Sequence, residues 1–390
     1  MLKNRLSTPQ GSIPAFQNPI KTAVETWVSP LLGNMPIFFG DGAAAQLPQF
    51  LDQQQFDKVF IVTDPRVFDL HGAFLMQLFP GLFSPEVIRI PEGENGKNLV
   101  NLEGICKELF DRGATKNSLV LNFGGGAVLN VGGLAASLCY RGLRFIQIPT
   151  TMMAQSDVIV SNKQGINFAG GKNRLGLFAT PLAAFADPRF CRTEAPRSLK
   201  SALVEFAKNA ILLGGEEFEQ VVDFLSESEN DFSSERLNQL LRASLLQKFA
   251  IAKLDPSEKN FGLVLEYGHT VGHAIEGLSQ GRMLHGEAVY HGMNIEGRLA
   301  NLIGLFPDTE YKRQSLLLSR IRGIPSVPAD ISVGQLMQSV HRDNKKRDAG
   351  LSFVLLQAIG QPHFTGPSVL TSVSEDALRQ VLLEYRDALL

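Results

Sequence analysis

The stretch SLVLNFGGGAVLN, residues 118–130, decides the fold that the sequence predicts. An apolar run typical of a buried strand leads into three glycines, and a helical pattern starts at about Val128. Backbone N–H groups at the start of such a helix can hold a phosphate, so the stretch is a candidate dinucleotide site. It is not GxGxxG, because Leu129 occupies the third glycine position. Tight packing of the strand against the helix is the other explanation of these glycines.

Short apolar segments alternate with helical ones on both sides of this stretch. Further strands are predicted at 36–40, 56–64, 86–90, 145–149 and 183–187, and an amphipathic helix at 97–113. This alternation predicts an α/β fold with a mostly parallel sheet covered on both faces.

Beyond about residue 190 the pattern becomes helical. Helices are predicted at 198–213, 216–227, 234–254, 263–278, 285–304 and 309–321, with one late strand candidate at 353–360. We therefore expect an extension at 1–34, a dinucleotide-binding α/β domain at 35–190 and a mainly α-helical domain at 191–390.

Composition excludes several classes of partner. The 390 residues are 44% hydrophobic and 19% charged, with a net charge of −2, so no nucleic acid or membrane surface is expected as a partner. Three widely spaced cysteines and no apolar run behind the N-terminus suit a cytoplasmic protein. Residues 118–140 are uncharged and long enough to span a bilayer, but their glycines favour a buried strand and helix.

Four of the seven histidines lie in one stretch, GLVLEYGHTVGHAIEGLSQGRMLHGEAVYH, residues 262–291. His269 and His273 are four residues apart, so a helix would place them on one face, and a second helix is expected to begin at His285. Neutral imidazoles are common zinc ligands. Buried structural histidines are the alternative, but the number and spacing favour a site. The motif is not that of zinc proteases, because Thr270 follows His269.

A predicted helix at 201–212 carries Glu205 and Lys208 among apolar residues. Such charges are costly to bury unless they pair or bind a ligand. A structural ion pair is one explanation. The other is that Glu205 joins the histidines at a metal with open coordination positions.

Two further segments suggest ligand binding. Asp64 ends a predicted strand, where it could accept the ribose hydroxyls of NAD or simply form a turn. A long loop is predicted at 157–176, and its cations and amides suit a phosphorylated substrate, although a solvated basic loop is equally expected.

Motifs in a fixed order resemble a known family. GGGxxxNxxG, RGxxFIQIPTT, AQSD, GKNxxG, ExxK, HTxGHAIE and LHGEA follow one another within about residues 36–365. This resembles the sugar phosphate cyclases, the superfamily of 3-dehydroquinate synthase and 2-deoxy-scyllo-inosose synthase. The resemblance implies a homodimer that uses NAD and one divalent metal, zinc or cobalt. It also implies a reaction of oxidation, phosphate elimination, reduction and aldol closure on a phosphorylated sugar.

The resemblance also assigns residues to roles. The implied metal ligands are Glu205, His269 and His285, and the implied catalytic residues are Lys163, Lys208, Glu266 and His273. The implied substrate contacts are Asp157, Lys172, Asn173, Lys345 and, from the partner of a dimer, Arg141. The implied NAD contacts are Asp64, Glu94, Lys97, Gly125, Gly126, Asn130, Thr150 and Thr151.

Two positions favour one branch of the superfamily. Glu266 and Gly262 stand where 3-dehydroquinate synthase has the Asn and Arg that meet a substrate carboxylate. Glu266, and Asn130 in place of Asp, resemble 2-deoxy-scyllo-inosose synthase, whose substrate is glucose 6-phosphate. Against this, AQSD and FIQIPTT suit either branch, and Lys259 could supply a cation. A metal-dependent polyol-phosphate dehydrogenase and a non-catalytic NAD- or sugar-phosphate-binding protein are the alternatives from other classes.

Overall fold

The computed structural model describes residues 24–29, 35–79, 84–169, 171–226, 234–252, 261–344 and 351–387. These residues form two compact units. One unit contains the described residues up to 194 together with 234–245, and the other contains the described residues of 195–231 and 246–387. Lys345, a predicted substrate contact, lies outside the described residues.

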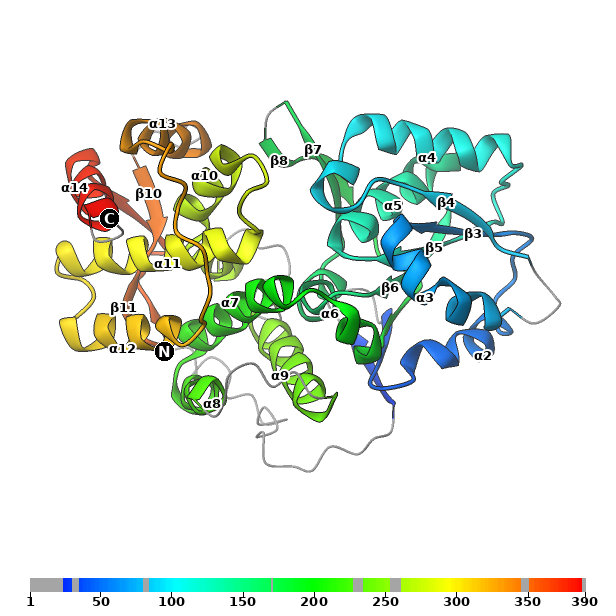
Figure 1. Cartoon of the computed structure of the whole chain (residues 1–390), viewed down its shortest axis with the longest axis horizontal. Helices are drawn as coiled ribbons and strands as arrows, with labels where there is room; N and C mark the ends of the chain where they lie inside the picture. The colour runs from blue at the N-terminus through cyan, green and yellow to red at the C-terminus, as the bar shows by residue number, and fades with distance from the viewer. Residues whose placement is uncertain are drawn as a thin grey trace. The chain divides into compact units, whose positions relative to one another are not determined.

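A seven-stranded sheet forms the centre of the first unit (Figure 1). Its strands are β1 (Glu25–Ser29), β2 (Met35–Phe39), β3 (Val59–Thr63), β4 (Glu86–Arg89), β5 (Leu119–Gly124), β6 (Arg144–Pro149) and β9 (Ala183–Ala186). Their order is β1-β2-β9-β6-β5-β3-β4, and every pair except β1–β2 is parallel. The expected mostly parallel sheet is confirmed. β1 lies within the segment predicted to be an extension, so that prediction missed a strand.

Helices cover both faces of this sheet because successive side chains of each strand point to opposite sides. Phe60 and Val62 pack against α4 (Leu99–Asp111) and α5 (Gly126–Leu138). Val59 and Ile61 pack on the other face, against α2 (Leu47–Leu51) and α3 (Pro65–Gln77). The uncharged run 118–140 is thus mainly β5 and α5, and none of the described helices is long and apolar enough to cross a membrane.

The predicted long loop at 157–176 is wrong. After α6 (Met152–Ser156), the chain forms an antiparallel hairpin of β7 (Lys163–Phe168) and β8 (Gly171–Phe178). Most of β8 is exposed, so its sequence lacks the alternation of apolar and polar residues that marks a half-buried strand.

Helices dominate the second unit. They are α7 (Pro196–Leu213), α8 (Gly215–Ser226), the last part of α9 (Ser234–Ala252), α10 (His269–Ser279), α11 (His285–Leu302), α12 (Asp308–Ser319), α13 (Val333–Asn344) and α14 (Glu375–Asp387). The predicted late strand corresponds to β10 (Leu351–Val354) and β11 (Leu356–Ala358), which pair with β13 (Leu370–Val373) and β12 (Gln361–Pro362). α13 and α14 were not predicted.

One predicted helix, 263–278, is interrupted. The chain forms a 3₁₀ helix, η7 (Phe261–Glu266), before α10 begins at His269. Gly268 between them has a φ of 77°, in the left-handed region that glycine adopts without strain. Within the described ranges, the other 3₁₀ helices are η2 (Ala43–Gln46), η3 (Gly93–Gly96), η4 (Cys139–Arg141), η5 (Val158–Val160) and η6 (Pro188–Thr193).

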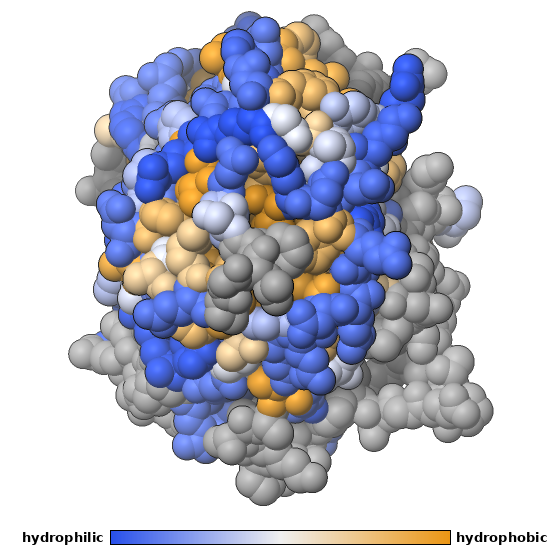
Figure 2. Space-filling model, turned by 90° about the vertical axis from the view of Figure 1, so that its right-hand side faces the viewer, coloured by the Kyte–Doolittle hydropathy of each residue, from blue (hydrophilic) through white to orange (hydrophobic). Residues whose placement is uncertain are grey.

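The molecular surface mixes residue types. On the face drawn in Figure 2, hydrophobic residues are interspersed among hydrophilic ones. Large apolar side chains are exposed at several described positions, including Val100 at 78% and Phe178 at 69%. Scattered exposed apolar residues of this kind are normal for a globular protein.

Candidate functional site

The first requirement of the site is a close approach of α7 and α11. The Gly286 N–H donates to Ser201 Oγ at 3.0 Å, and a Cβ on Gly286 would lie only 1.9 Å from the Ser201 carbonyl oxygen. Ser201 and Glu205 are four residues apart on α7 and therefore share a face. The contact at Gly286 consequently brings His285, the first residue of α11, close to Glu205.

α10 and α11 also pack at backbone distance. A Cβ on Gly292 would lie 1.9 Å from the Gly268 carbonyl oxygen, and one on Gly272 would lie 3.2 Å from Val289 Cα. Bulkier residues at these positions would separate the helices. The close packing places His269, at the start of α10, near His285.

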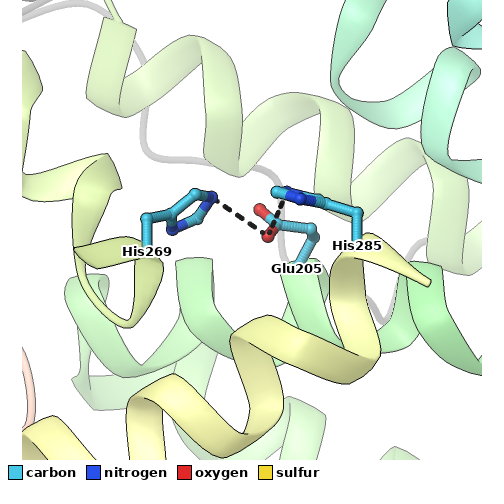
Figure 3. A group of neighbouring side chains, drawn as sticks. All are labelled: Glu205, His269 and His285. Carbon is cyan, nitrogen blue, oxygen red and sulfur yellow. Dashed lines mark ion pairs between the residues drawn. The ribbon is translucent and has the colours of Figure 1, made fainter. Parts of the chain in front are cut away.

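Glu205, His269 and His285 converge as a result (Figure 3). Glu205 Oε1 lies 3.5 Å from His269 Nε2 and 3.6 Å from His285 Nε2. These separations are too long for hydrogen bonds. Two ligands of one tetrahedral zinc, each about 2.0–2.2 Å from the ion, would be roughly 3.3–3.6 Å apart. The spacing therefore fits a metal ion between the three side chains.

Protonation supports the same interpretation. His269 Nδ1 lies 3.1 Å from the Tyr267 carbonyl oxygen, which can only accept, so Nδ1 carries the proton and Nε2 has a lone pair. Burial, followed by the positive charge of Lys208, lowers the pKa of His269 well below its ordinary value and keeps the ring neutral. Glu205 Oε1 is buried and accepts no hydrogen bond among the described residues. A lone pair directed at a carboxylate oxygen calls for a cation between them.

Lys208 and His273 lie beside this group. Lys208, only 2% exposed, places Nζ 2.6 Å from Glu205 Oε2, so Glu205 has an ion pair on one oxygen while the other faces the imidazoles. The ring of His273 is centred 5.2 Å from that of His269 and 5.8 Å from that of His285. His273 is thus close to the candidate metal ligands Glu205, His269 and His285. The role of each residue stays a prediction.

Sequence reasoning missed two buried carboxylates. Glu276 Oε2 lies 3.2 Å from His285 Nδ1. Glu296 accepts the N–H groups of Gly268 at 2.7 Å and Val271 at 3.1 Å, and so caps the start of α10. Burial raises the pKa of Glu296 to about 8, and the charge of Glu266 contributes to the increase. The spacing of 269, 273 and 276 on one helical face was the available signal for Glu276.

In the first unit, the candidate NAD residues cluster where the strand order reverses. From β3 the chain continues to one side of the sheet, to β4, whereas from β5 it continues to the other side, to β6. Ligands of open α/β sheets bind at the carboxyl ends of strands at such a point. Asp64 follows β3, and Gly125 follows β5 as the residue that precedes α5.

The glycine turn packs tightly against its neighbours, as the alternative explanation of its glycines requires, and a buried polar atom lies beside it. A Cβ on Gly125 would lie 3.2 Å from Thr151 Cγ2, and one on Gly126 would lie 3.3 Å from Val158 Cγ2. The Thr150 N–H donates to the Gly124 carbonyl, but its buried Oγ1 has no hydrogen-bond partner among the described residues. An unpartnered buried hydroxyl beside a helix N-terminus fits a phosphate-bearing cofactor.

Asp64 already has a structural role. Its side chain caps α3 by accepting the Val67 N–H at 2.9 Å, and burial raises the pKa of its carboxyl. The second carboxylate oxygen could still accept a hydroxyl. The structure therefore supports the capping explanation without excluding the predicted contact with ribose.

Polar contacts connect the other predicted residues of this unit. Lys97 Nζ donates to Asn130 Oδ1 at 2.7 Å, and Asn130 Nδ2 donates to the Lys163 carbonyl at 3.4 Å. Lys172 Nζ lies 3.5 Å from Glu94 Oε2. The structure thus brings together loop, helix and hairpin residues that are distant in the sequence.

The other predicted residues lie on β8, at the end of α6, in η4 and in η7. Asn173 has a φ of 53°, and its N–H donates to Asn167 Oδ1 at 3.1 Å. Asp157 ends α6, and Arg141 is exposed in η4 with a φ of 65°. Glu266 lies in η7 and not on α10, so the helix predicted at 263–278 does not carry both Glu266 and His269.

Comparison with known proteins identifies the family. Models of the N-terminal and C-terminal parts of 3-dehydroquinate synthase match residues 87–201 and 202–346. The chain belongs to the 3-dehydroquinate synthase family of sugar phosphate cyclases. It is therefore an enzyme of the lyase class, as the motifs predicted.

Relatives come from two branches of this family. The 2-deoxy-scyllo-inosose synthase of Niallia circulans is 30% identical over 351 residues, covering 89% of this chain and 95% of the relative. The 3-dehydroquinate synthase of a Sulfurovum species is 34% identical over 342 residues, covering 86% and 93%. A crystal structure of 2-deoxy-scyllo-inosose synthase complexed with carbaglucose-6-phosphate, NAD⁺ and Co²⁺ superposes with a TM-score of 0.85 at 28% identity, covering 93% and 99%.

Proposed function

We propose that this sugar phosphate cyclase uses NAD and one divalent metal to convert glucose 6-phosphate to 2-deoxy-scyllo-inosose. The observation that carries the choice of substrate is Glu266, which ends η7 three residues before His269. 3-Dehydroquinate synthase, which acts on a carboxylated substrate, is the alternative, and sequence identity to relatives does not separate the two.

Charge near the start of α10 favours the neutral sugar. Glu266 is partly buried, and its charge helps to raise the pKa of Glu296, so two carboxyl groups lie close together there. A substrate carboxylate at this position would be repelled, and Gly262 offers no cation to balance it. Sugar hydroxyls could instead donate hydrogen bonds to Glu266.

The candidate ligands support dependence on a metal and NAD. Glu205, His269 and His285 would hold the ion, and the turn at Gly125 with Thr150 would hold the cofactor. When bound, the two would supply Lewis-acid and reversible redox chemistry. Lys208 would keep Glu205 oriented through its second oxygen, and the similar solved synthase carries NAD⁺ and Co²⁺.

The substrate phosphate would be bound by Lys163, Lys172 and Asn173 of the β7–β8 hairpin, because cations and amides match a dianion. Arg141 would complete the site from the second subunit of a homodimer. Analytical ultracentrifugation checks the expected dimer.

The test compares phosphate release from glucose 6-phosphate and from the heptulosonate phosphate used by 3-dehydroquinate synthase, each with NAD and Zn²⁺ or Co²⁺. We expect turnover of the former and little of the latter. Glu266→Asn should weaken turnover of glucose 6-phosphate, whereas Glu266→Asp, which retains the charge, should weaken it less. Efficient turnover of the heptulosonate phosphate by the unmodified protein would show that the assignment to the 2-deoxy-scyllo-inosose synthase branch is wrong. The assignment to the family would not change.

A further inference from the structure

We propose that Glu276 is a positioning residue that orients the His285 imidazole toward the metal. The inference rests on the proposed metal-dependent function. Glu276 Oε2 lies 3.2 Å from His285 Nδ1, on the side of the ring opposite the nitrogen that faces Glu205. A carboxylate accepts, so Nδ1 carries the proton and Nε2 is left as the ligand atom.

Helix geometry places Glu276 for this contact. His269, His273 and Glu276 occupy positions i, i+4 and i+7 of α10, so all three project from one face. Glu276 is only 5% exposed, so its carboxylate is largely removed from water on its side of the contact. One helix thereby supplies a candidate ligand and the carboxylate that would orient a ligand from the next helix.

The two imidazoles have different acceptors. His269 Nδ1 faces the peptide carbonyl of Tyr267, whose side chain is fixed by a 2.8 Å hydrogen bond from its hydroxyl to Gln314 Oε1. His285 Nδ1 faces a carboxylate, which raises the basicity of the imidazole more than a neutral carbonyl does. Removing the charge of Glu276 should therefore weaken His285 as a ligand in addition to loosening its orientation.

The competing explanation is that the contact between Glu276 and His285 only holds α10 and α11 together and does not act on the metal ligand. Asp330 provides a matched control. Its carboxylate lies 2.7 Å from the guanidinium of Arg282, which is in the turn between these two helices. Asp330→Asn removes an ion pair from the same turn without touching a candidate ligand.

The experiment measures Zn²⁺ affinity by chelator competition and the visible absorption spectrum of the Co²⁺ form. Glu276→Ala should weaken Zn²⁺ binding by about 10- to 100-fold, the usual effect of removing such a partner. The isosteric Glu276→Gln should weaken it less but still change the Co²⁺ spectrum, and it keeps the test available if Glu276→Ala does not fold. Asp330→Asn should match the parent.

Three results would overturn the inference. Parent-like Zn²⁺ affinity and Co²⁺ spectra in both Glu276 variants would show that the carboxylate does not act on the ligand and leave the proposed function intact. Lower thermal stability of Glu276→Gln with unchanged Zn²⁺ affinity would mark the pair as structural. Failure of the unmodified protein to bind either metal would overturn the metal-dependent function as well.

Discussion

The two carboxylate oxygens of Glu205 face different partners, so a single substitution would change two interactions at once. One pairs with buried Lys208 and the other faces His269 and His285. Removing the carboxylate would leave the lysine buried without its counter-charge, which costs up to about 3–5 kcal/mol. Loss of metal could therefore follow either from the missing ligand or from local unfolding.

A double variant separates these effects. Glu205→Gln should lower Zn²⁺ affinity by more than roughly 100-fold, because losing a residue that merely hydrogen-bonds to a ligand already costs about 10- to 100-fold. It should also lower the free energy of unfolding. Glu205→Gln with Lys208→Met should recover stability in denaturant unfolding but not Zn²⁺ content by elemental analysis. Recovery of both would show that Glu205 serves only as the partner of Lys208.

At single residues, the sequence predicted the candidate ligands but not what orients them. The spacing of His269 and His273 was visible because helical periodicity brings these two positions to one face. His285 entered the predicted ligand set through the family motifs. Glu296 was hidden, and the helical spacing of Glu276 did not reveal its contact with His285, since both sets of contacts depend on how α10 packs against α11. That packing is decided by glycines, whose pattern alone does not distinguish helix contact from a turn.

The close contact of α10 and α11 makes a prediction at the scale of helices. Gly292→Ala would place a Cβ 1.9 Å from the Gly268 carbonyl oxygen, so the helices must separate. We expect a loss of about 1–3 kcal/mol in unfolding free energy, as for other overpacked contacts, together with weaker Zn²⁺ binding.

Gly277 is a matched control on the same pair of helices. It is exposed on α10, and a Cβ there would meet no atom within 4 Å. Gly277→Ala should raise the unfolding free energy by about 0.5–1 kcal/mol, because alanine loses less backbone entropy in a helix. If Gly292→Ala binds Zn²⁺ like Gly277→Ala and is equally stable, the close contact does not shape the metal site.

Elements with a strong apolar pattern were predicted well, and those without one were not. β3, β5 and β6 are almost entirely buried, and most of their residues are apolar. The β7–β8 hairpin is largely exposed, and the interruption before α10 depends on one glycine with a positive φ, so local pattern did not reveal either. β1 was missed because it follows a proline-containing segment and is short.

At the scale of the whole molecule, the family match extends across both units, from residue 87 to 346. The candidate NAD residues belong to one unit and the candidate metal ligands to the other. The sequence predicted that these two sets lie in different parts of the chain, because the strand–helix alternation stops near residue 190. The roles of the residues stay predictions. The precise domain limits stay a prediction.

If the candidate cofactor and metal sites act in a cyclase cycle, the protein should differ from a dehydrogenase in its use of NAD. If one substrate is oxidised and later reduced within the same turnover, the two redox steps cancel. Each NAD should therefore support many turnovers of phosphate release from glucose 6-phosphate, with no net rise in NADH absorbance. Removal of metal by a chelator should stop phosphate release, and Zn²⁺ or Co²⁺ should restore it. NADH that accumulates in step with product would instead identify a simple dehydrogenase reaction and contradict the cyclase cycle.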